Sequence, residues 1–284
     1  MQASYKYKLK NGVEIPCIGY GTAPLTDAIG KEMPVGIKYA LKCGYRLIDT
    51  AWAYKNEEYL GKAIRESEID RKELFITSKC SNRFRGYERA LACFKESLSL
   101  LKLEYLDLYL IHWPAKDGPE KEWQKLNSET WRAFETLYKD GYIRAIGVSN
   151  FWPHHLKPLM ENAEIQPMVL QLEYHPGYTQ PGPVAFAKEN GMIVEAWSPF
   201  GSGQLLNNDT LKRIGEKYGK TPAQVILNWC IRNEIIPIPK SNNEKRVAEN
   251  LNVFDFELSD EDMNTLNSMS YFGGSGWTPD TITW

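Results

Sequence analysis

The sequence predicts an α/β protein folded as a (β/α)8 barrel. Eight apolar, strand-like runs alternate with helix-patterned segments, and eight is the number of strands that closes such a barrel. Several of these runs end in residues that can do chemistry, and the active site of a (β/α)8 barrel is built where its strands end. The runs lie at 17–22, 46–50, 74–79, 106–112, 143–150, 168–174, 193–199 and 236–241.

We expect one barrel domain over residues 1–284, with an N-terminal β-hairpin at about 5–16 and a C-terminal tail at about 270–284. YKYKLK alternates polar and apolar residues, and Asn11-Gly12 predicts a two-residue type I′ turn before the second hairpin strand. The glycine-rich stretch 273–276 introduces the tail. Neither a linker nor a low-complexity segment marks a second domain.

The segments between the strands carry helix signals. Apolar residues recur at steps of three and four in 90–101 and 126–137. Thr221 followed by Pro222 is typical of a helix N-terminus, and Ser259 followed by acidic residues begins a last helix.

A doubly wound sheet with a Rossmann nucleotide site is the alternative architecture. It needs the pattern GxGxxG after the first strand. The chain offers Gly19-Tyr20-Gly21-Thr22 without the third glycine, so the barrel is favoured.

Composition excludes several classes of function. The 284 residues are 43% hydrophobic and 25% charged with a net charge of −2, which does not favour binding to nucleic acid or to an anionic membrane. The first residues are polar, and no apolar run reaches the roughly 18 residues of a membrane span. The five cysteines are odd in number and scattered, so we expect free thiols in a cytoplasmic protein. Neither they nor the four histidines show metal-ligand spacing, so we expect no metal site.

Four residues together indicate an active site. Asp49, Lys79 and His112 end the second, third and fourth predicted strands, and Tyr54 follows Asp49 by five residues. Each alone has an ordinary explanation: a helix cap, an exposed lysine, a core histidine and a tyrosine packed at the barrel rim. Ends of consecutive strands are neighbours, so we expect the four side chains to meet at the barrel mouth.

The chemistry of these four residues fits proton transfer. A free tyrosine has a pKa of about 10, and an adjacent ammonium group lowers it. We therefore expect Lys79, held by Asp49, to lower the pKa of Tyr54, while a neutral His112 orients a carbonyl oxygen. A carbonyl needs such an acid when a hydride reaches its carbon.

Together with the segments around them, these four residues resemble the aldo-keto reductase family, and the resemblance covers nearly the whole chain. The resemblance lies in ordered, correctly spaced segments: GYGT at 19–22, DTAWAYKNEEYLGKAI at 49–64, FITSK at 75–79, YLIHWP at 109–114, IGVSNF at 146–151, QLEYHP at 171–176, AWSPFGSG at 196–203, IPKSNNEKRVAEN at 238–250 and FDFELSDED at 254–262.

The resemblance implies an (α/β)8 barrel that reduces aldehydes and ketones to alcohols with NADPH, with Tyr54 as proton donor. It implies that the ring at 197, usually tyrosine in the family and here Trp197, stacks on the nicotinamide. The residues that it implies for cofactor binding are Thr22, Ser149, Asn150, Gln171, Trp197, Ser198, Lys240, Ser241, Asn242, Arg246, Glu249 and Asn250.

Two features of the resemblance concern specificity. Lys240 and Arg246 can pair with the 2′-phosphate that distinguishes NADPH from NADH, although Arg246 could also be part of a solvated helix face. In the substrate mouth, many relatives carry tryptophan where this chain has Ala23. The substrate residues that we expect are Ala23, Trp52, Trp113 and Trp277, and for each tryptophan packing is the alternative.

Two other classes of function compete with a carbonyl reductase. One is a non-catalytic binding protein that keeps the barrel and its cofactor, and the other is a barrel isomerase or hydrolase. The intact set Asp49, Tyr54, Lys79 and His112 argues against the first. The lack of paired carboxylates or metal ligands at the strand ends argues against the second. We expect a monomer, because the barrel closes its own sheet and no exposed apolar stripe demands a partner.

Overall fold

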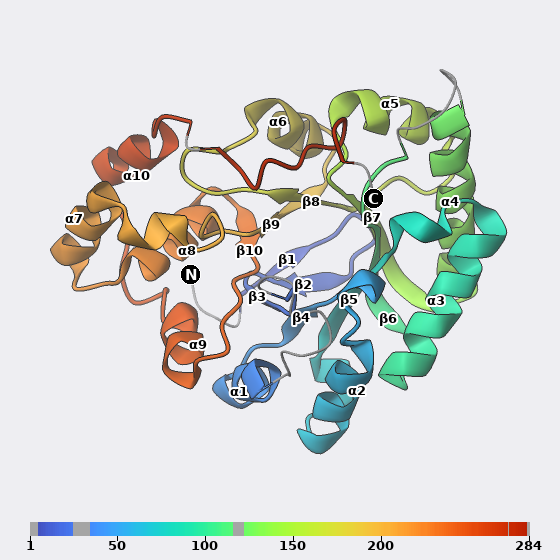
Figure 1. Cartoon of the computed structure of the whole chain (residues 1–284), viewed down its shortest axis with the longest axis horizontal. Helices are drawn as coiled ribbons and strands as arrows, with labels where there is room; N and C mark the ends of the chain where they lie inside the picture. The colour runs from blue at the N-terminus through green and yellow to red at the C-terminus, as the bar shows by residue number, and fades with distance from the viewer. Residues whose placement is uncertain (1–4, 25–34, 116–121, 272, 283–284) are drawn as a thin grey trace.

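The eight predicted strands form one closed sheet (Figure 1). The computed structural model describes residues 5–24, 35–115, 122–271 and 273–282. The strands pair in parallel in the order β10-β9-β8-β7-β6-β5-β4-β3, and the backbone N–H of Gly21 donates to the carbonyl of Pro239 at 3.0 Å. This bond joins the two edges and confirms the (β/α)8 barrel. The strands are β3 (Gly19–Gly21), β4 (Leu47–Asp49), β5 (Phe75–Cys80), β6 (Leu106–Ile111), β7 (Ile143–Ser149), β8 (Val169–Glu173), β9 (Ile193–Trp197) and β10 (Ile235–Pro237).

Helices surround the barrel in the described part of the chain. They are α1 (Val35–Cys43), α2 (Glu57–Glu66), α3 (Tyr87–Leu101), α4 (Glu122–Lys139), α5 (Pro153–Asn162), α6 (Pro181–Glu189), α7 (Asp209–Tyr218), α8 (Pro222–Arg232), α9 (Glu244–Leu251) and α10 (Asp260–Asn267). Short 3-10 turns are η1 (Trp52–Tyr54), η2 (Arg71–Glu73), η3 (Asn82–Phe84) and η4 (Gln204–Asn207). None of the described helices is both long and apolar enough to cross a membrane.

The helix starts predicted from the sequence are confirmed at α8 and α10. The Thr221 hydroxyl accepts the N–H of Gln224 at 3.3 Å, and the Ser259 hydroxyl accepts the N–H of Asp262 at 3.2 Å. Both side chains satisfy backbone donors that have no partner within the helix, which is why these residues begin helices.

The N-terminal hairpin is present, but its turn differs from the predicted type I′ turn. Strands β1 (Lys6–Lys8) and β2 (Glu14–Pro16) pair antiparallel. A type I′ turn needs positive φ at both central residues, whereas only Gly12 has one, at 87°. The Gly12 N–H donates to the carbonyl of Leu9, and the Leu9 N–H donates to Val13, which makes a three-residue loop. Asn11 is held instead by its side chain, which donates to the carbonyl of Arg144 at 2.8 Å.

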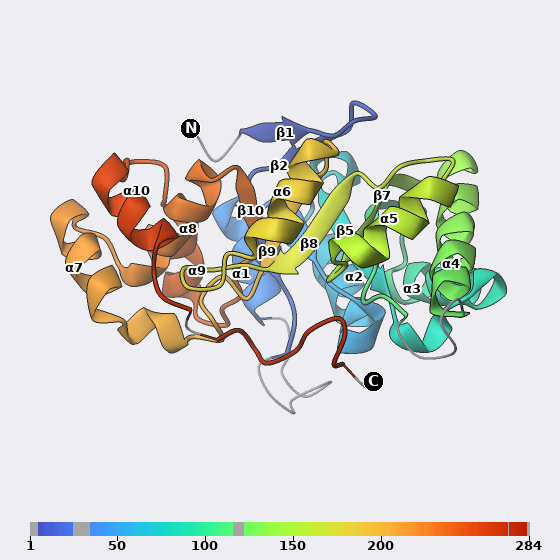
Figure 2. The same cartoon turned by 90° about the horizontal axis from the view of Figure 1, so that it is seen from above.

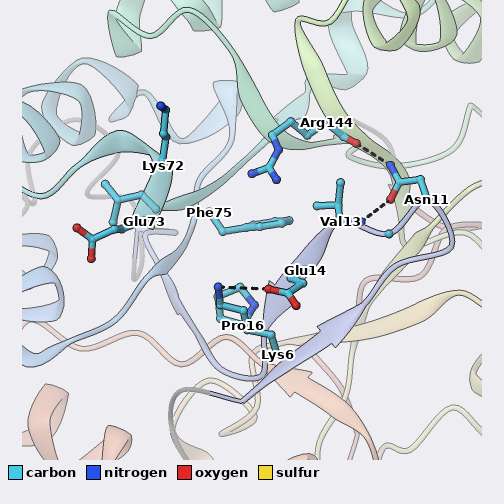
Figure 3. A pocket seen from close by; sticks show the side chains of 11 residues that line it. Lys6, Asn11, Val13, Glu14, Pro16, Lys72, Glu73, Phe75 and Arg144 are labelled. Atoms are coloured by element: carbon cyan, nitrogen blue, oxygen red, sulfur yellow. Dashed lines mark hydrogen bonds and ion pairs between the residues drawn. The ribbon is translucent and has the colours of Figure 1, made fainter.

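The hairpin and the C-terminal tail lie at opposite ends of the barrel (Figure 2). The hairpin covers the end where the strands begin, and the tail crosses the end where they finish. A polar groove of about 460 Å³ lies between the hairpin and the start of β5, lined among others by Glu14, Lys72 and Arg144 (Figure 3). Its place at the strand N-termini separates it from the residues predicted to be catalytic.

Candidate active site

Strands β4 and β5 bring Asp49 and Lys79 together inside the barrel. The Lys79 ammonium lies 2.5 Å from Asp49 Oδ1 and donates to the carbonyl of Thr50 at 3.0 Å. The two side chains are 1% and 5% exposed. Burial by itself lowers the pKa of Lys79, but Asp49, Tyr54 and Glu195 together raise that pKa above its ordinary value. Lys79 is therefore a buried cation, and the alternative of a solvent-exposed lysine is wrong.

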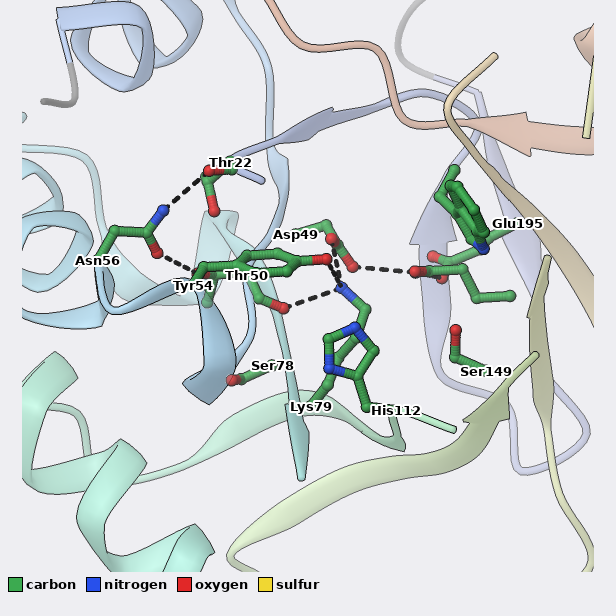
Figure 4. A network of polar contacts seen from close by, with 12 residues as sticks. Thr22, Asp49, Thr50, Tyr54, Asn56, Ser78, Lys79, His112, Ser149 and Glu195 are labelled. Atoms are coloured by element: carbon green, nitrogen blue, oxygen red, sulfur yellow. Dashed lines mark hydrogen bonds and ion pairs between the residues drawn. The ribbon is translucent and has the colours of Figure 1, made fainter. Parts of the chain in front are cut away.

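The turn η1 places Tyr54 over this ion pair (Figure 4). Its hydroxyl lies 3.5 Å from Lys79 Nζ. Asn56, which follows the turn, accepts the Thr50 hydroxyl at 2.7 Å and donates to the carbonyl of Thr22 at 2.8 Å. Asn56 thus ties the Tyr54 turn to β3 and β4.

The pKa of Tyr54 corrects one expectation from the sequence. Burial raises the pKa of the phenol above its ordinary value, and the attraction of Lys79 offsets only part of this rise. The expected net lowering was wrong, because the lysine acts against desolvation by the surrounding barrel. Tyr54 consequently keeps its proton at neutral pH, which is the state that a proton donor needs.

His112 follows β6 and completes the predicted group of four. Its ring meets that of Tyr54 edge to face with the centroids 5.6 Å apart. Burial and the nearby charge of Lys79 hold the pKa of His112 well below its ordinary value. The imidazole is therefore neutral, so one ring nitrogen donates a hydrogen bond and the other accepts one.

The predicted nicotinamide residues lie on β7, β8 and β9 or just after them. Asn150 adopts a left-handed φ of 63°. Its amide nitrogen donates to the carbonyl of His112 and to the Ser149 hydroxyl, both at 3.0 Å. Its amide oxygen accepts the indole N–H of Trp197 at 2.8 Å. Trp197 also meets Trp113 edge to face at 6.4 Å, so the larger ring is accommodated and fixes the amide of Asn150.

The remaining predicted cofactor residues occupy three separate places. Thr22 is buried beside Asp49, whose carbonyl accepts its N–H at 3.0 Å, and Ser198 has a left-handed φ of 49°. The segment after β10 is anchored by the Tyr20 hydroxyl, which donates to the carbonyl of Ser241 at 2.8 Å. Asn250 is buried on α9. The exposed or half-buried members of the set are Ser198, Lys240, Asn242, Arg246 and Glu249.

The predicted substrate residues are placed less uniformly. Trp113 is 3% exposed, and Trp52 is 9% exposed and packs edge on against Phe84 at 4.9 Å. Trp277 is 51% exposed on the tail that crosses the mouth. Ala23 is half-buried beside Thr22 and Pro24, and the chain that follows at 25–34 lies outside the described residues.

A second cluster joins the tail to α5. Asp280 Oδ1 lies 3.0 Å from His154 Nε2 and 3.3 Å from His155 Nε2, so three possible metal ligands meet. However, His155 Nδ1 accepts the N–H of Trp152 at 3.3 Å, which places the proton of a neutral ring on Nε2. That proton suits a hydrogen bond to Asp280 and not a metal ion, and the cluster fastens the tail.

Comparisons with known proteins point to one family. A sequence model described as "Aldo/keto reductase family" matches residues 18–270. A Bacillus subtilis protein named glyoxal reductase is 50% identical over 97% of this chain and 96% of its own. The solved structure of an aldo-keto reductase from a deep-sea metagenome library has a TM-score of 0.90 and 43% identity, covering 99% of this chain and 100% of its own.

A further solved relative carries a cofactor. The structure of a Bombyx mori aldo-keto reductase in complex with NADP has a TM-score of 0.86 at 34% identity, covering 95% of this chain and 94% of its own. Both its identity and its coverage are high enough to indicate common ancestry and not only a common fold. The chain belongs to the aldo/keto reductase family of oxidoreductases.

Proposed function

We propose that this protein reduces aldehydes and ketones to alcohols with NADPH and that Tyr54 is the proton donor. The observation that carries the proposal is the Tyr54 hydroxyl 3.5 Å from a buried Lys79–Asp49 pair, beside a neutral His112. The similarity to a protein named glyoxal reductase and to a structure in complex with NADP supports the reaction and the cofactor.

NADPH, when bound, supplies a hydride to the carbonyl carbon. Tyr54 gives its proton to the carbonyl oxygen, so that the carbon and oxygen together gain the two hydrogens of the alcohol. The phenolate left on Tyr54 is stabilised by the ammonium of Lys79 until it regains a proton from solvent. His112, uncharged, donates a hydrogen bond that holds the carbonyl oxygen near the phenol.

The residues present fit this cofactor. Gln171 in the middle of β8 and Asn150 just after β7 carry carboxamide groups that can pair with the amide of the nicotinamide. Lys240 and Arg246 supply positive charge after β10 and at the start of α9, which suits a 2′-phosphate.

Titration of the protein with NADPH, followed by an aromatic aldehyde, tests the proposal. We expect cofactor fluorescence to change on binding and the absorbance of NADPH to fall when the aldehyde is added. Binding without turnover would instead indicate the non-catalytic class, and no binding would indicate an isomerase or hydrolase.

We further propose a monomer in the cytoplasm. A hydrogen bond from Gly21 to Pro239 joins the two edges of the eight-stranded sheet, which leaves the barrel little edge for a second chain. All five cysteines are free thiols, as a reducing compartment maintains. Light scattering that gives the mass of one chain, 32.6 kDa, is the expected result.

A further inference from the structure

Glu195 is a buried acid that the proposed reaction does not use. It is the third residue of β9, and its side chain lies inside the barrel beside Asp49, 0% exposed (Figure 4). Acidic side chains are rarely buried this deeply without a partner, because desolvation penalises their charge. Its position within the catalytic network therefore calls for a role.

Among the described residues, the side chain of Glu195 has one hydrogen-bond partner, the amide of Gln171. Gln171 Nε2 donates to Asp49 Oδ2 at 2.9 Å and to Glu195 Oε2 at 2.8 Å. An amide nitrogen carries two hydrogens, and these two carboxyl oxygens use both. The flipped orientation of the Gln171 amide is unfavourable, because its carbonyl oxygen would then face the carboxylate of Asp49.

The other end of the amide is left for a ligand. Among the described residues, we find no hydrogen bond to Gln171 Oε1, although Gln171 is buried. An amide held from one side in this way presents a hydrogen-bond acceptor in a fixed direction. The carboxamide of the nicotinamide carries an NH2 group, which can donate a hydrogen bond to this acceptor.

We propose that Glu195 is a positioning residue, which together with Asp49 fixes the Gln171 amide so that its oxygen reads the NH2 group of the nicotinamide. This inference rests on the proposed use of NADPH. It assigns Glu195 an effect on cofactor recognition that is exerted only through Gln171.

The electrostatics of the network agree with this role. Burial and the nearby charge of Asp49 raise the pKa of Glu195 to about 8, while the Gln171 hydrogen bond and Lys79 on β5 act in the opposite direction. At neutral pH the acid is therefore largely protonated. Its Oε2 accepts from Gln171, and its Oε1 has no hydrogen-bond partner among the described residues.

Cofactor selectivity tests the proposal directly. The probe is the reduced 3-acetylpyridine analogue of NADPH, in which a methyl group replaces the amide NH2. The dissociation constants of NADPH and the analogue are measured for the wild type, Glu195→Leu, Glu195→Asp and Glu195→Gln. Glu57→Leu is a matched control, because Glu57 is also a buried acid but bonds Ser78 and Ser97 instead.

We expect the wild type to bind NADPH more tightly than the analogue. In Glu195→Leu, the ratio of the two dissociation constants should shrink by roughly 2- to 12-fold, the range of one neutral hydrogen bond. In Glu195→Asp, which is one methylene too short to reach Gln171, the ratio should shrink too. Glu195→Gln and Glu57→Leu should keep the wild-type ratio. A merely structural role for Glu195 would weaken both cofactors equally and leave their ratio unchanged.

Two outcomes would overturn the proposal: an unchanged ratio in a folded Glu195→Leu, or loss of the preference in Glu195→Gln. If the leucine variant does not fold, the aspartate variant decides by the same criterion. Failure of the proposed function looks different, because the wild type would then neither bind NADPH nor reduce an aldehyde.

Discussion

At the scale of single residues, the site depends on how buried charges are paired. Asp49 and Lys79 neutralise each other inside the barrel, and Tyr54 and His112 beside them are uncharged. In the proposed reaction, the transferable proton and the charge that assists its transfer therefore sit on different residues. Substitutions can separate the two contributions.

Replacing Tyr54 by phenylalanine removes only the hydroxyl. We expect kcat for an aromatic aldehyde to fall by roughly 100-fold or more, the usual contribution of a general acid, while NADPH affinity is kept. Steady-state kinetics and a fluorescence titration measure the two quantities. A variant that keeps most of its turnover would remove Tyr54 from the role of acid.

Replacing Lys79 by methionine has two consequences. Turnover should fall, because the phenolate of Tyr54 loses its neighbouring cation. The protein should also lose about 3–5 kcal/mol of stability, since Asp49 remains buried without its partner. The double variant Asp49→Asn/Lys79→Met should regain part of the stability but not the turnover. Denaturant unfolding and kcat, measured on both variants, check this; recovery of both together would contradict it.

Glu195 should make the folded protein less stable as the pH rises. Its pKa is raised to about 8 in the folded protein from the ordinary 4.5, so the folded state binds the proton more tightly. The associated stability is fully present below about pH 4.5 and is lost as pH rises through about 8, by at most about 1.4 kcal/mol per pH unit. The melting temperature of the cofactor-free protein should therefore fall more between pH 6 and 9 than that of Glu195→Gln. Parallel melting curves would contradict the prediction.

At the scale of elements, the sequence predicted what depends on local pattern. All eight strands were found because each is an apolar run covered on both faces. The residues that we propose to be catalytic were singled out because they stand at or just after the ends of such runs. Glu195 was not singled out, because it lies in the middle of β9, whereas the candidate residues were sought at the ends of the predicted strands. The sign of the Tyr54 pKa shift was missed because desolvation depends on the assembled barrel.

Helix α9 carries the residue that should distinguish the two nicotinamide cofactors. Asn243 caps this helix by accepting the N–H of Arg246 at 3.1 Å, which fixes the backbone of an exposed arginine. Arg246→Ala should weaken NADPH by roughly 10- to 150-fold, the loss of a charged hydrogen bond, and NADH much less. Titrations with both cofactors check this. Equal weakening would mean that Arg246 is only part of a solvated helix face.

At the scale of the whole molecule, the tail is fastened at two places across the barrel mouth. Glu173 at the end of β8 accepts the N–H and the hydroxyl of Ser275, both at 2.9 Å, and Asp280 contacts the two histidines of α5. The exposed Trp277 lies between these anchors. Access of large substrates should therefore depend on both anchors.

Loosening the second anchor tests the role of the tail. Asp280→Ala should make the tail more sensitive to limited proteolysis and change KM for a bulky ketone by roughly 2- to 5-fold, the scale of an exposed ion pair. The kcat/KM of a small aldehyde should stay nearly constant, because the residues around Tyr54 are untouched. Identical proteolysis of variant and wild type would show that Asp280 does not hold the tail.

The chain positions of the buried charges have a consequence for how the molecule assembles. Asp49 and Lys79 are only 30 residues apart and belong to one β4-α2-β5 unit, whereas Gln171 lies 122 residues beyond Asp49. Contacts between segments close in sequence form with the smallest loss of chain entropy. The ammonium group can thus meet its carboxylate while the first half of the barrel is still open to water. The second half then adds an amide and a neutral acid, so at no stage must the growing core enclose an uncompensated charge.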